Sequence, residues 1–161
     1  MCKRCDYPRL LNDAGLEQTP HRLRVLEVIG DVGRPLSAQE VLTEVNRGQD
    51  VNKVTVYRIL ELLVEHNLVE RISSGDRSFR YGLAPNENHR SHPHFFCLTC
   101  GRMECLSPAA MPLDMDSLKG SVSGAVRGVQ IRLDGSCREC LQKKGLMTSS
   151  KKHEPAGRRP D

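Results

Sequence analysis

The chain has 161 residues, 38% of them hydrophobic, and a formal net charge of +4. This length suits one domain or two small ones, each near the size at which a core needs support from a metal or a partner subunit. No stretch approaches the roughly 20 apolar residues of a membrane span, and Met1–Asp6 lack the apolar segment of a secretion signal, so we expect a cytoplasmic protein without membrane contact. Residues 1–83 and 84–142 each carry equal numbers of basic and acidic side chains, so bulk charge gives no argument for nucleic-acid binding.

Three strong helices are predicted after a short one near residues 7–14. The first follows Thr19-Pro20, an N-cap with proline at the first helical position, and ends before Gly33. The second begins at Ser37-Ala38-Gln39-Glu40, the pattern of a capping box. The third runs from Asn52 to about Asn67, because its apolar residues recur at helical spacing.

Two short strands are expected next, over residues 68–72 and 78–83. Helix, turn, helix and a two-stranded wing together form a DNA-reading architecture. The third helix starts with polar side chains suited to phosphates and base edges, namely Lys53, Thr55, Tyr57 and Arg58. The same pattern also occurs in protein-interaction modules, and a basic helix end is often only a solvated face.

Four cysteines occur as two CxxC pairs, Cys97-Leu98-Thr99-Cys100 and Cys137-Arg138-Glu139-Cys140. Two intervening residues allow a tight turn to aim both thiolates at one metal, and four thiolates close a tetrahedral zinc shell without an open position for chemistry. We therefore predict a structural zinc site, with Gly101 and Gly135 as turn residues beside it, and no enzyme activity. A redox dithiol is the alternative for either pair.

The rest of the second half is less regular. Apolar residues between 107 and 128 suggest a helix, and residues 130–133 suggest a strand that leads into the second CxxC pair. Residues 143–161 are rich in lysine, arginine, serine, glycine and proline, and we expect a disordered basic tail. Cys2 and Cys5 form a third CxxC, for which no function is expected.

Several of these motifs occur together in the order of one known family. They are the Thr19–Arg22 run, the capping-box helix, Val54-Thr55-Val56-Tyr57-Arg58, the wing, and His92-Pro93-His94-Phe95-Phe96-Cys97-Leu98-Thr99-Cys100-Gly101. Over roughly residues 7–142 the chain resembles the ferric uptake regulator family of metal-dependent repressors.

The resemblance implies an α/β (α+β) fold with two domains. Residues 1–83 would form a winged helix-turn-helix domain for DNA binding, and residues 84–142 a small α/β dimerisation domain that carries the four-cysteine zinc. It also implies a homodimer that binds double-stranded operator DNA when a second, regulatory metal is present. We expect Arg22 to contribute to DNA binding with the third helix.

The regulatory metal would bind a second group of residues. His92 and His94 match the paired regulatory histidines of the family, and on a strand both imidazoles face one side. Cys105 stands where relatives usually carry an acidic residue, and a hairpin around Gly101 would bring it close to His94. Glu70 aligns with an acidic ligand of zinc-sensing relatives, and His89 is the alternative fourth ligand.

This ligand set departs from the iron-sensing pattern. Arg34-Pro35 replaces a histidine of iron-type members, and Gly82 replaces a strand-end glutamate or cysteine. A further accessory site of some relatives would need ligands at the positions of Ser91, Pro93 and Val129, none of which is a useful ligand, so we expect that site to be missing.

Thiolate combined with imidazole favours Zn2+, so the sequence is most similar to the zinc uptake regulator branch. The predicted function is a zinc-responsive repressor of metal uptake genes. The alternatives are a regulator that senses iron or peroxide, with Fe2+ or Mn2+ as the regulatory metal, and a zinc-stapled interaction or redox module without operator specificity. Cys105 as a buried small hydrophobe and Glu70 as a solvated charge are the alternatives for the individual residues.

Overall fold

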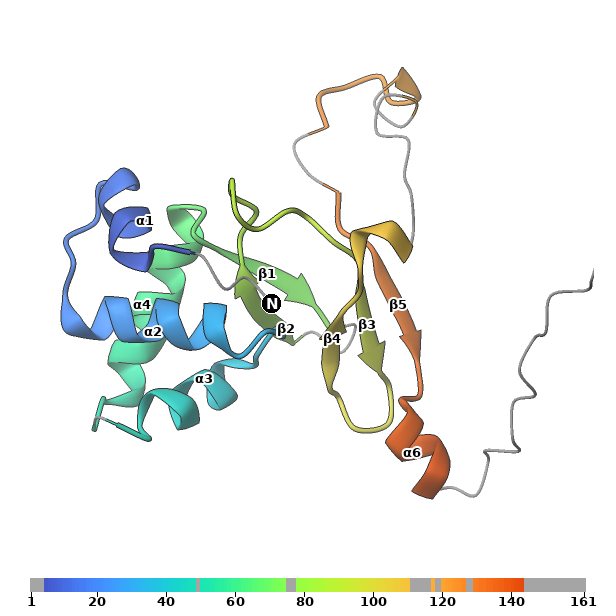
Figure 1. Cartoon of the computed structure of the whole chain (residues 1–161), viewed down its shortest axis with the longest axis horizontal. Coiled ribbons are helices and arrows are strands. Elements are labelled where there is room, and N and C mark those ends of the chain that lie inside the picture. The colour runs from blue at the N-terminus through green and yellow to red at the C-terminus, as the bar shows by residue number, and fades with distance from the viewer. Residues whose placement is uncertain are drawn as a thin grey trace, which may run out of the picture.

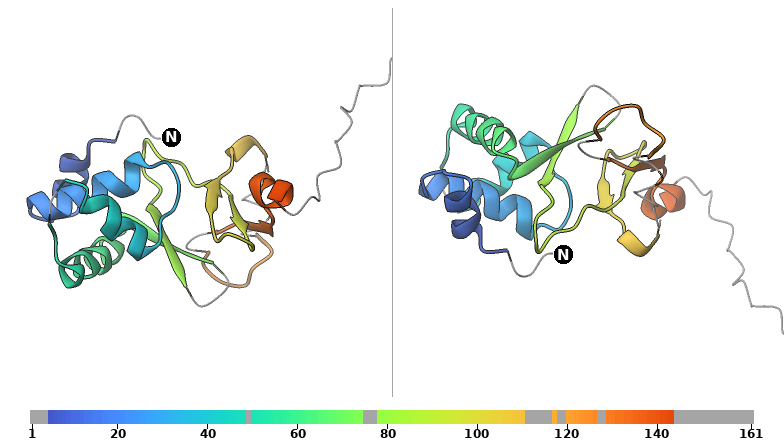
Figure 2. Two further views of the ribbon diagram at one scale, coloured as in Figure 1. Left: turned by 90° about the horizontal axis from the view of Figure 1, so that it is seen from below. Right: turned by 90° about the horizontal axis from the view of Figure 1, so that it is seen from above.

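The computed structural model describes residues 5–48, 50–74, 78–110, 117, 120–126 and 129–143. Four helices come first, then a two-stranded hairpin, and then a three-stranded sheet with a short helix after it (Figure 1). The helices and the sheet lie at opposite ends of the molecule, with the hairpin between them in all three views (Figure 2). None of the helices in the described ranges is long and apolar enough to span a membrane.

The elements have the following bounds: α1 Tyr7–Asp13, α2 Pro20–Asp31, α3 Ala38–Val45, α4 Lys53–Glu65, β1 Val69–Ser73, β2 Phe79–Leu83, β3 His94–Cys97, β4 Met103–Cys105, η1 Pro108–Ala110, β5 Arg132–Gly135 and α6 Arg138–Lys143.

The predicted helix starts are confirmed. The Thr19 hydroxyl accepts the backbone N–H of Arg22 at the start of α2. At α3, the Ser37 hydroxyl accepts the backbone N–H of Glu40, and the Glu40 carboxylate accepts the backbone N–H of Ser37 at 2.8 Å. These reciprocal bonds satisfy donors that the first turn of a helix leaves free.

The four helices enclose one apolar core. Its fully buried side chains are leucines and valines at helical spacing, with hairpin residues on one side: Leu11, Val25, Leu26, Leu36, Val41, Val45, Val56, Leu60, Leu63 and Val69. The buried residues of α4 lie on one face of the helix, so this packing leaves its opposite face in solvent.

The predicted wing is present as the antiparallel pair β1–β2, in which Val69 pairs with Leu83 and Ser73 with Phe79. Tyr81 extends the hairpin through a β-bridge to Leu36, in the connection between α2 and α3. The wing is thereby fixed to the helices rather than projecting from them alone.

The sheet has the strand order β4-β3-β5. Strands β3 and β4 form the predicted hairpin around Gly101, whose φ of +69° is the left-handed conformation that glycine adopts at no steric cost. Strand β5 lies parallel to β3 on its other side. The mixed α+β fold expected from the sequence is confirmed.

The second half of the chain is less regular than the first. The last strand spans Arg132–Gly135 rather than 130–133, because its pairing with β3 begins with Arg132 opposite His94, the first residue of β3. Gly135 ends that strand instead of making a turn, and a side chain there would lie 3.1 Å from the Phe95 ring. Of the helix expected over 107–128, the structure describes the single turn η1, helical residues at 117 and 120, and irregular chain after them. Residues 111–116, 118, 119, 127 and 128 lie outside the described part, as do Cys2 and the tail beyond Lys143.

Candidate metal centres and nucleic-acid interface

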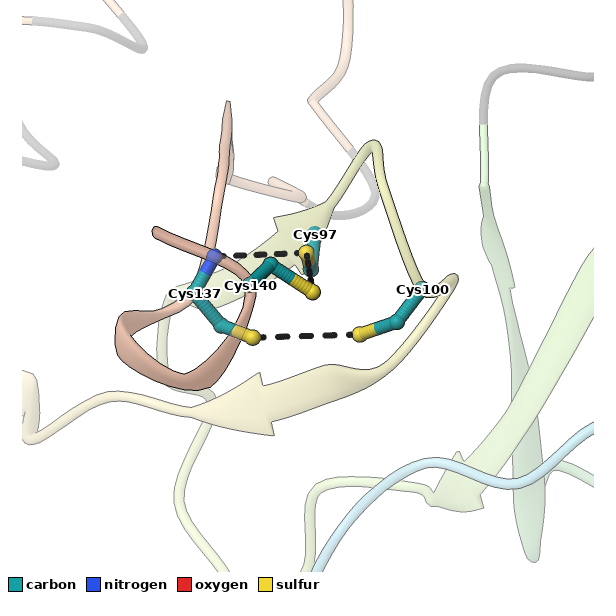
Figure 3. Close-up of side chains that lie close together, drawn as sticks. All are labelled: Cys97, Cys100, Cys137 and Cys140. Carbon is teal, nitrogen blue, oxygen red and sulfur yellow. Dashed lines mark hydrogen bonds between the residues drawn. The ribbon is translucent and has the colours of Figure 1, made fainter. Parts of the chain in front are cut away.

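The four cysteines of the two CxxC pairs converge. Cys97 ends β3, Cys100 lies in the following turn, Cys137 precedes α6 and Cys140 lies within it. The Sγ atoms are 3.9 Å apart between Cys97 and Cys140 and 3.8 Å apart between Cys100 and Cys137, and all four lie within 4.8 Å of one another (Figure 3). A zinc ion with four sulfur ligands at about 2.3 Å requires sulfurs roughly 3.8 Å apart, so this arrangement fits a tetrahedral metal shell.

Hydrogen bonds and burial act differently on the individual thiols of this cluster. The N–H of Cys137 donates to the Cys97 sulfur at 3.2 Å. Burial raises the pKa of Cys97, but hydrogen bonds from the backbone of Cys137, Cys100 and Thr99 outweigh it and lower the pKa to about 6. By contrast, the hydrogen bond with Cys137 and burial raise the pKa of Cys140 to about 12. A metal cation would favour the thiolate form of all four groups.

A salt bridge connects the two CxxC turns. Both Nη atoms of Arg102 donate to the carboxylate of Glu139, at 3.0 and 3.1 Å. The N–H of Leu98 also donates to the carbonyl of Gly135 at 2.7 Å. These contacts join segments about 37 residues apart in the chain, so the cysteine cluster ties the end of the sheet to α6.

A second cluster contains His92, His94 and Cys105, whose ligand atoms also lie within 4.8 Å of one another. His94 and Cys105 are paired across β3 and β4, as the hairpin around Gly101 predicts. His92 lies just before β3 rather than on it, yet its ring centroid is 4.7 Å from that of His94. Pairing and turn together place two imidazoles and one thiol around a common point.

His94 is in the form that binds a metal. Burial, and then the nearby His92 and His89, lower the pKa of His94 to about 4, so its imidazole is neutral at physiological pH. His92 Nδ1 is 2.9 Å from the carbonyl oxygen of Arg90, and its Nε2 is buried without a hydrogen-bond partner in the described part of the chain. A metal-ligating histidine typically donates one ring N–H to a carbonyl and offers the other nitrogen to the metal. Partial burial of the Cys105 thiol raises its pKa. The residue as a whole is exposed, so the alternative of a buried small hydrophobe is wrong.

Glu70 and His89 line the pocket next to this cluster but do not belong to the group of mutually close ligand atoms. Burial raises the pKa of Glu70, and the nearby His92 opposes that shift. The His89 ring centroid is 4.9 Å from that of His92. Both residues are therefore neighbours of the cluster, and the choice between them as a fourth ligand stays open.

The polar start of α4 faces solvent. Lys53, Tyr57 and Arg58 are exposed and Thr55 is half-buried, while the apolar face of the helix packs into the core. Lys53 Nζ lies 5.4 Å from the centroid of the Tyr57 ring. Arg22 lies on α2, where its guanidinium donates to the carbonyl of Glu17 at 3.0 Å.

Comparison with known proteins decides the family. The model of the ferric uptake regulator family matches residues 13–111. The chain belongs to the ferric uptake regulator family. A ferric uptake regulation protein of Cupriavidus metallidurans is 31% identical over 134 residues, which cover 81% of this chain and 90% of the relative.

Solved structures of ferric uptake regulators and related proteins share the fold. The Vibrio cholerae ferric uptake regulator has a TM-score of 0.65 and 25% identity, with 82% of this chain and all of that chain covered. A zinc uptake regulator complexed with zinc and DNA has a TM-score of 0.57 and 24% identity, with 88% and 99% covered. This member of the ferric uptake regulator family is therefore a metal-responsive transcriptional regulator and not an enzyme.

Two features of this ferric uptake regulator family member are not predicted by the sequence patterns. Val54 is 56% exposed beside the polar residues of α4, and its spacing of three from Tyr57 could have indicated a shared face. Arg80 binds groups from two distant segments, Glu40 and Gly101, and no local pattern predicts such contacts. Arg34, Pro35 and Gly82, which depart from the iron-sensing pattern, line the same pocket as His92, His94 and Cys105.

Proposed function

We propose that the chain is a zinc-responsive repressor that binds operator DNA as a homodimer. The observation that carries the zinc assignment is the cluster of His92, His94 and Cys105, in which the Nε2 of His92 is buried and has no hydrogen-bond partner among the residues that the structure describes. Imidazole and thiolate suit Zn2+, whereas sites for iron and manganese generally use more carboxylate. The names of both ferric uptake regulators given above refer to iron. The zinc assignment therefore rests on this ligand set and not on those relatives.

A zinc ion held there would have His92, His94 and Cys105 as ligands and either Glu70 or His89 as the fourth. Glu70 lies on β1 of the β1–β2 hairpin, whereas His92, His94 and Cys105 lie on or next to the three-stranded sheet. A metal that joined them would favour one orientation of the hairpin and helices relative to the sheet, and a ligand shifts such an equilibrium by its differential affinity for the two orientations. The four-cysteine cluster would hold a separate, structural zinc.

DNA binding is assigned to α4 because its exposed face combines cationic, hydroxyl and aromatic groups. The shared fold with a zinc uptake regulator complexed with zinc and DNA supports this assignment. In a homodimer, two copies of α4 would meet half-sites about one helical turn apart. The domain limits expected from the sequence, 1–83 and 84–142, and a cytoplasmic location are part of the proposal.

Metal stoichiometry tests the two-site arrangement. Protein purified without added metal should contain one zinc per chain that withstands mild chelation, and titration should add one exchangeable zinc. A total of one zinc per chain after saturation would contradict the second site. Iron in the exchangeable site at equal free-metal concentration would instead favour the iron- or peroxide-sensing alternative.

Substitutions on α4 test the DNA interface. The test duplex is selected from a random pool by the zinc-loaded protein. Arg58→Ala should weaken binding to it by about 1–3 kcal/mol if Arg58 reads a base. Lys53→Ala should reduce the slope of log affinity against log salt concentration by about 1, which corresponds to one lost phosphate contact. Arg9→Ala is the matched control, because Arg9 is an exposed arginine of α1 paired with Asp13. Parent-like binding of both α4 variants would place the interface elsewhere, and failure to select any duplex would favour the interaction or redox module.

A further inference from the structure

A small apolar cluster joins the β1–β2 hairpin to the three-stranded sheet. It consists of Ile72 from the hairpin and Phe96 and Met103 from the sheet, which are 3%, 6% and 0% exposed. The cluster is separate from the main core of the helices. Its burial therefore depends on contact between hairpin and sheet, and removing any one side chain exposes the other two to water.

This cluster lies next to the proposed regulatory site in the same interface. On β3 and β4, His94 pairs with Cys105, and two residues further along Phe96 pairs with Met103. Alternate residues of a strand share one face of the sheet. The pair His94–Cys105 and the pair Phe96–Met103 are thus neighbours on one face of the sheet. Ile72 packs against the second pair.

Arg80 adds a buried polar connection at the end of this interface. From β2 it donates to the carbonyl of Gly101 at 2.5 Å, in the turn between β3 and β4, and it forms a salt bridge with Glu40 of α3. Arg34 pairs with the other oxygen of the same carboxylate at 2.9 Å. Arg80 therefore links the helices, the β1–β2 hairpin and the sheet. Because its side chain is only 15% exposed, loss of one partner would leave a hydrogen-bonding group unsatisfied away from water, which costs stability.

The segment around β5 contributes two more hydrogen bonds to the backbone of β1. Arg132 Nη1 donates to the carbonyl of Ser73, and Gln130 Nε2 donates to the carbonyl of Arg71 at 3.0 Å. The Arg132 guanidinium also lies 5.8 Å from the centroid of the Phe96 ring. The sheet therefore contacts the hairpin from β5 as well as from β3 and β4.

We propose that these contacts form a latch, made of Ile72, Phe96, Met103, Arg80 and Arg132, that holds the hairpin against the sheet before the regulatory metal binds. Arg80 is its main positioning residue. The latch raises the fraction of molecules in which the pocket of Glu70, His92, His94 and Cys105 is assembled before metal binding, so that less of the metal's binding free energy is needed to favour this orientation. No metal ligand belongs to the latch.

The first test uses neither the regulatory metal nor DNA, so its outcome is independent of the proposed function. Fluorescent noncanonical residues at the exposed positions Gln39 and Glu104 report the distance between α3 and the sheet in protein stripped of exchangeable metal. Ile72→Ala combined with Arg80→Met should lengthen and broaden this distance distribution. Arg9→Met, which removes an exposed arginine of α1 paired with Asp13, should leave it unchanged.

Two further variants separate the latch from general destabilisation. Val45→Ala weakens the main core without touching the interface and should keep the parent distance, whereas Arg132→Met alone should lengthen it, by less than the double variant. A parent-like distance distribution in the double variant, with helix content intact by circular dichroism, would overturn the proposal.

The second test rests on the proposed function. The apparent affinity for a ligand falls in proportion to the fraction of molecules in the binding-competent state. The double variant should therefore need several-fold more zinc for half-maximal DNA binding and reach the parent's maximum, since its ligands and α4 are intact. An unchanged zinc midpoint together with a longer distance would contradict the link between latch and metal.

Discussion

Replacing Cys137 with serine is expected to release the chelation-resistant zinc and to produce the largest loss of stability of any variant considered. Structural zinc in small protein units contributes on the order of 10 kcal/mol of apparent binding free energy, which is folding free energy when the site forms only in the folded chain. We expect the melting temperature to fall by about 10 °C or more, since a loss of several kcal/mol in the free energy of unfolding corresponds to a shift of this size. Metal analysis and a melting curve measure both effects.

Cys5→Ser is the matched control for this experiment. Cys5 is half-buried near the Asn86 side chain, and its sulfur belongs to neither cluster of converging ligand atoms among the described residues. Its zinc content and melting temperature should equal those of the parent. A Cys137→Ser protein that kept one tightly bound zinc and melted with the parent would show that the four sulfurs are not a metal shell.

The second large effect is expected at the regulatory cluster. Cys105→Ser and His92→Ala should each raise the zinc concentration needed for DNA binding by about 100-fold or more, because even outer-shell partners of metal ligands are typically worth 10- to 100-fold. The zinc of the four-cysteine shell should stay in place, since the two clusters share no ligand. Zinc-titrated duplex binding, with metal content measured in parallel, gives both quantities.

His66→Gln controls for the loss of a histidine as such. His66 is exposed at the end of α4, with its Nδ1 3.1 Å from the carbonyl oxygen of Ala14, and it lies outside both clusters. This variant should keep the parent's zinc midpoint. A Cys105→Ser protein with an unchanged zinc response would mean that Cys105, an exposed residue of β4, does not bind the regulatory metal.

Local patterns were sufficient to predict much of this fold. The caps at Thr19 and Ser37 act through side chains within three residues of their partners, so the sequence contains the whole interaction. The pairing of His94 with Cys105 was also predictable, because a short turn at Gly101 leaves few registers for the flanking strands. The convergence of the four cysteines followed from the doubled CxxC spacing alone.

Contacts across long stretches of chain were not predictable in this way. The register of β5 depends on where its parallel partner β3 begins, and the small size of Gly135 reflects the ring of Phe95 beside it. Arg80 reaches Glu40 and Gly101, 40 and 21 residues away. The orientation of His92 depends on its bond to Arg90 rather than on strand alternation. Such details depend on tertiary packing, which single-sequence patterns do not contain.

The same limit applies to the choice between Glu70 and His89. Each lies beside the cluster of His92, His94 and Cys105, on a different segment, and each approaches His92. Glu70→Gln and His89→Gln should separate them, because only the variant that lacks a ligand should raise the zinc midpoint. If neither does, the cluster binds metal through three protein ligands.

The most direct test of the zinc assignment is a comparison of metals in one DNA-binding assay. Protein that carries zinc only in the four-cysteine shell is titrated with Zn2+, with Fe2+ without oxygen, or with Mn2+, and binding to the selected duplex is measured at buffered free-metal concentrations. The ligand set of two imidazoles and a thiolate predicts activation by zinc at free concentrations far below those at which iron or manganese acts. Activation by Fe2+ or Mn2+ without activation by zinc would contradict it.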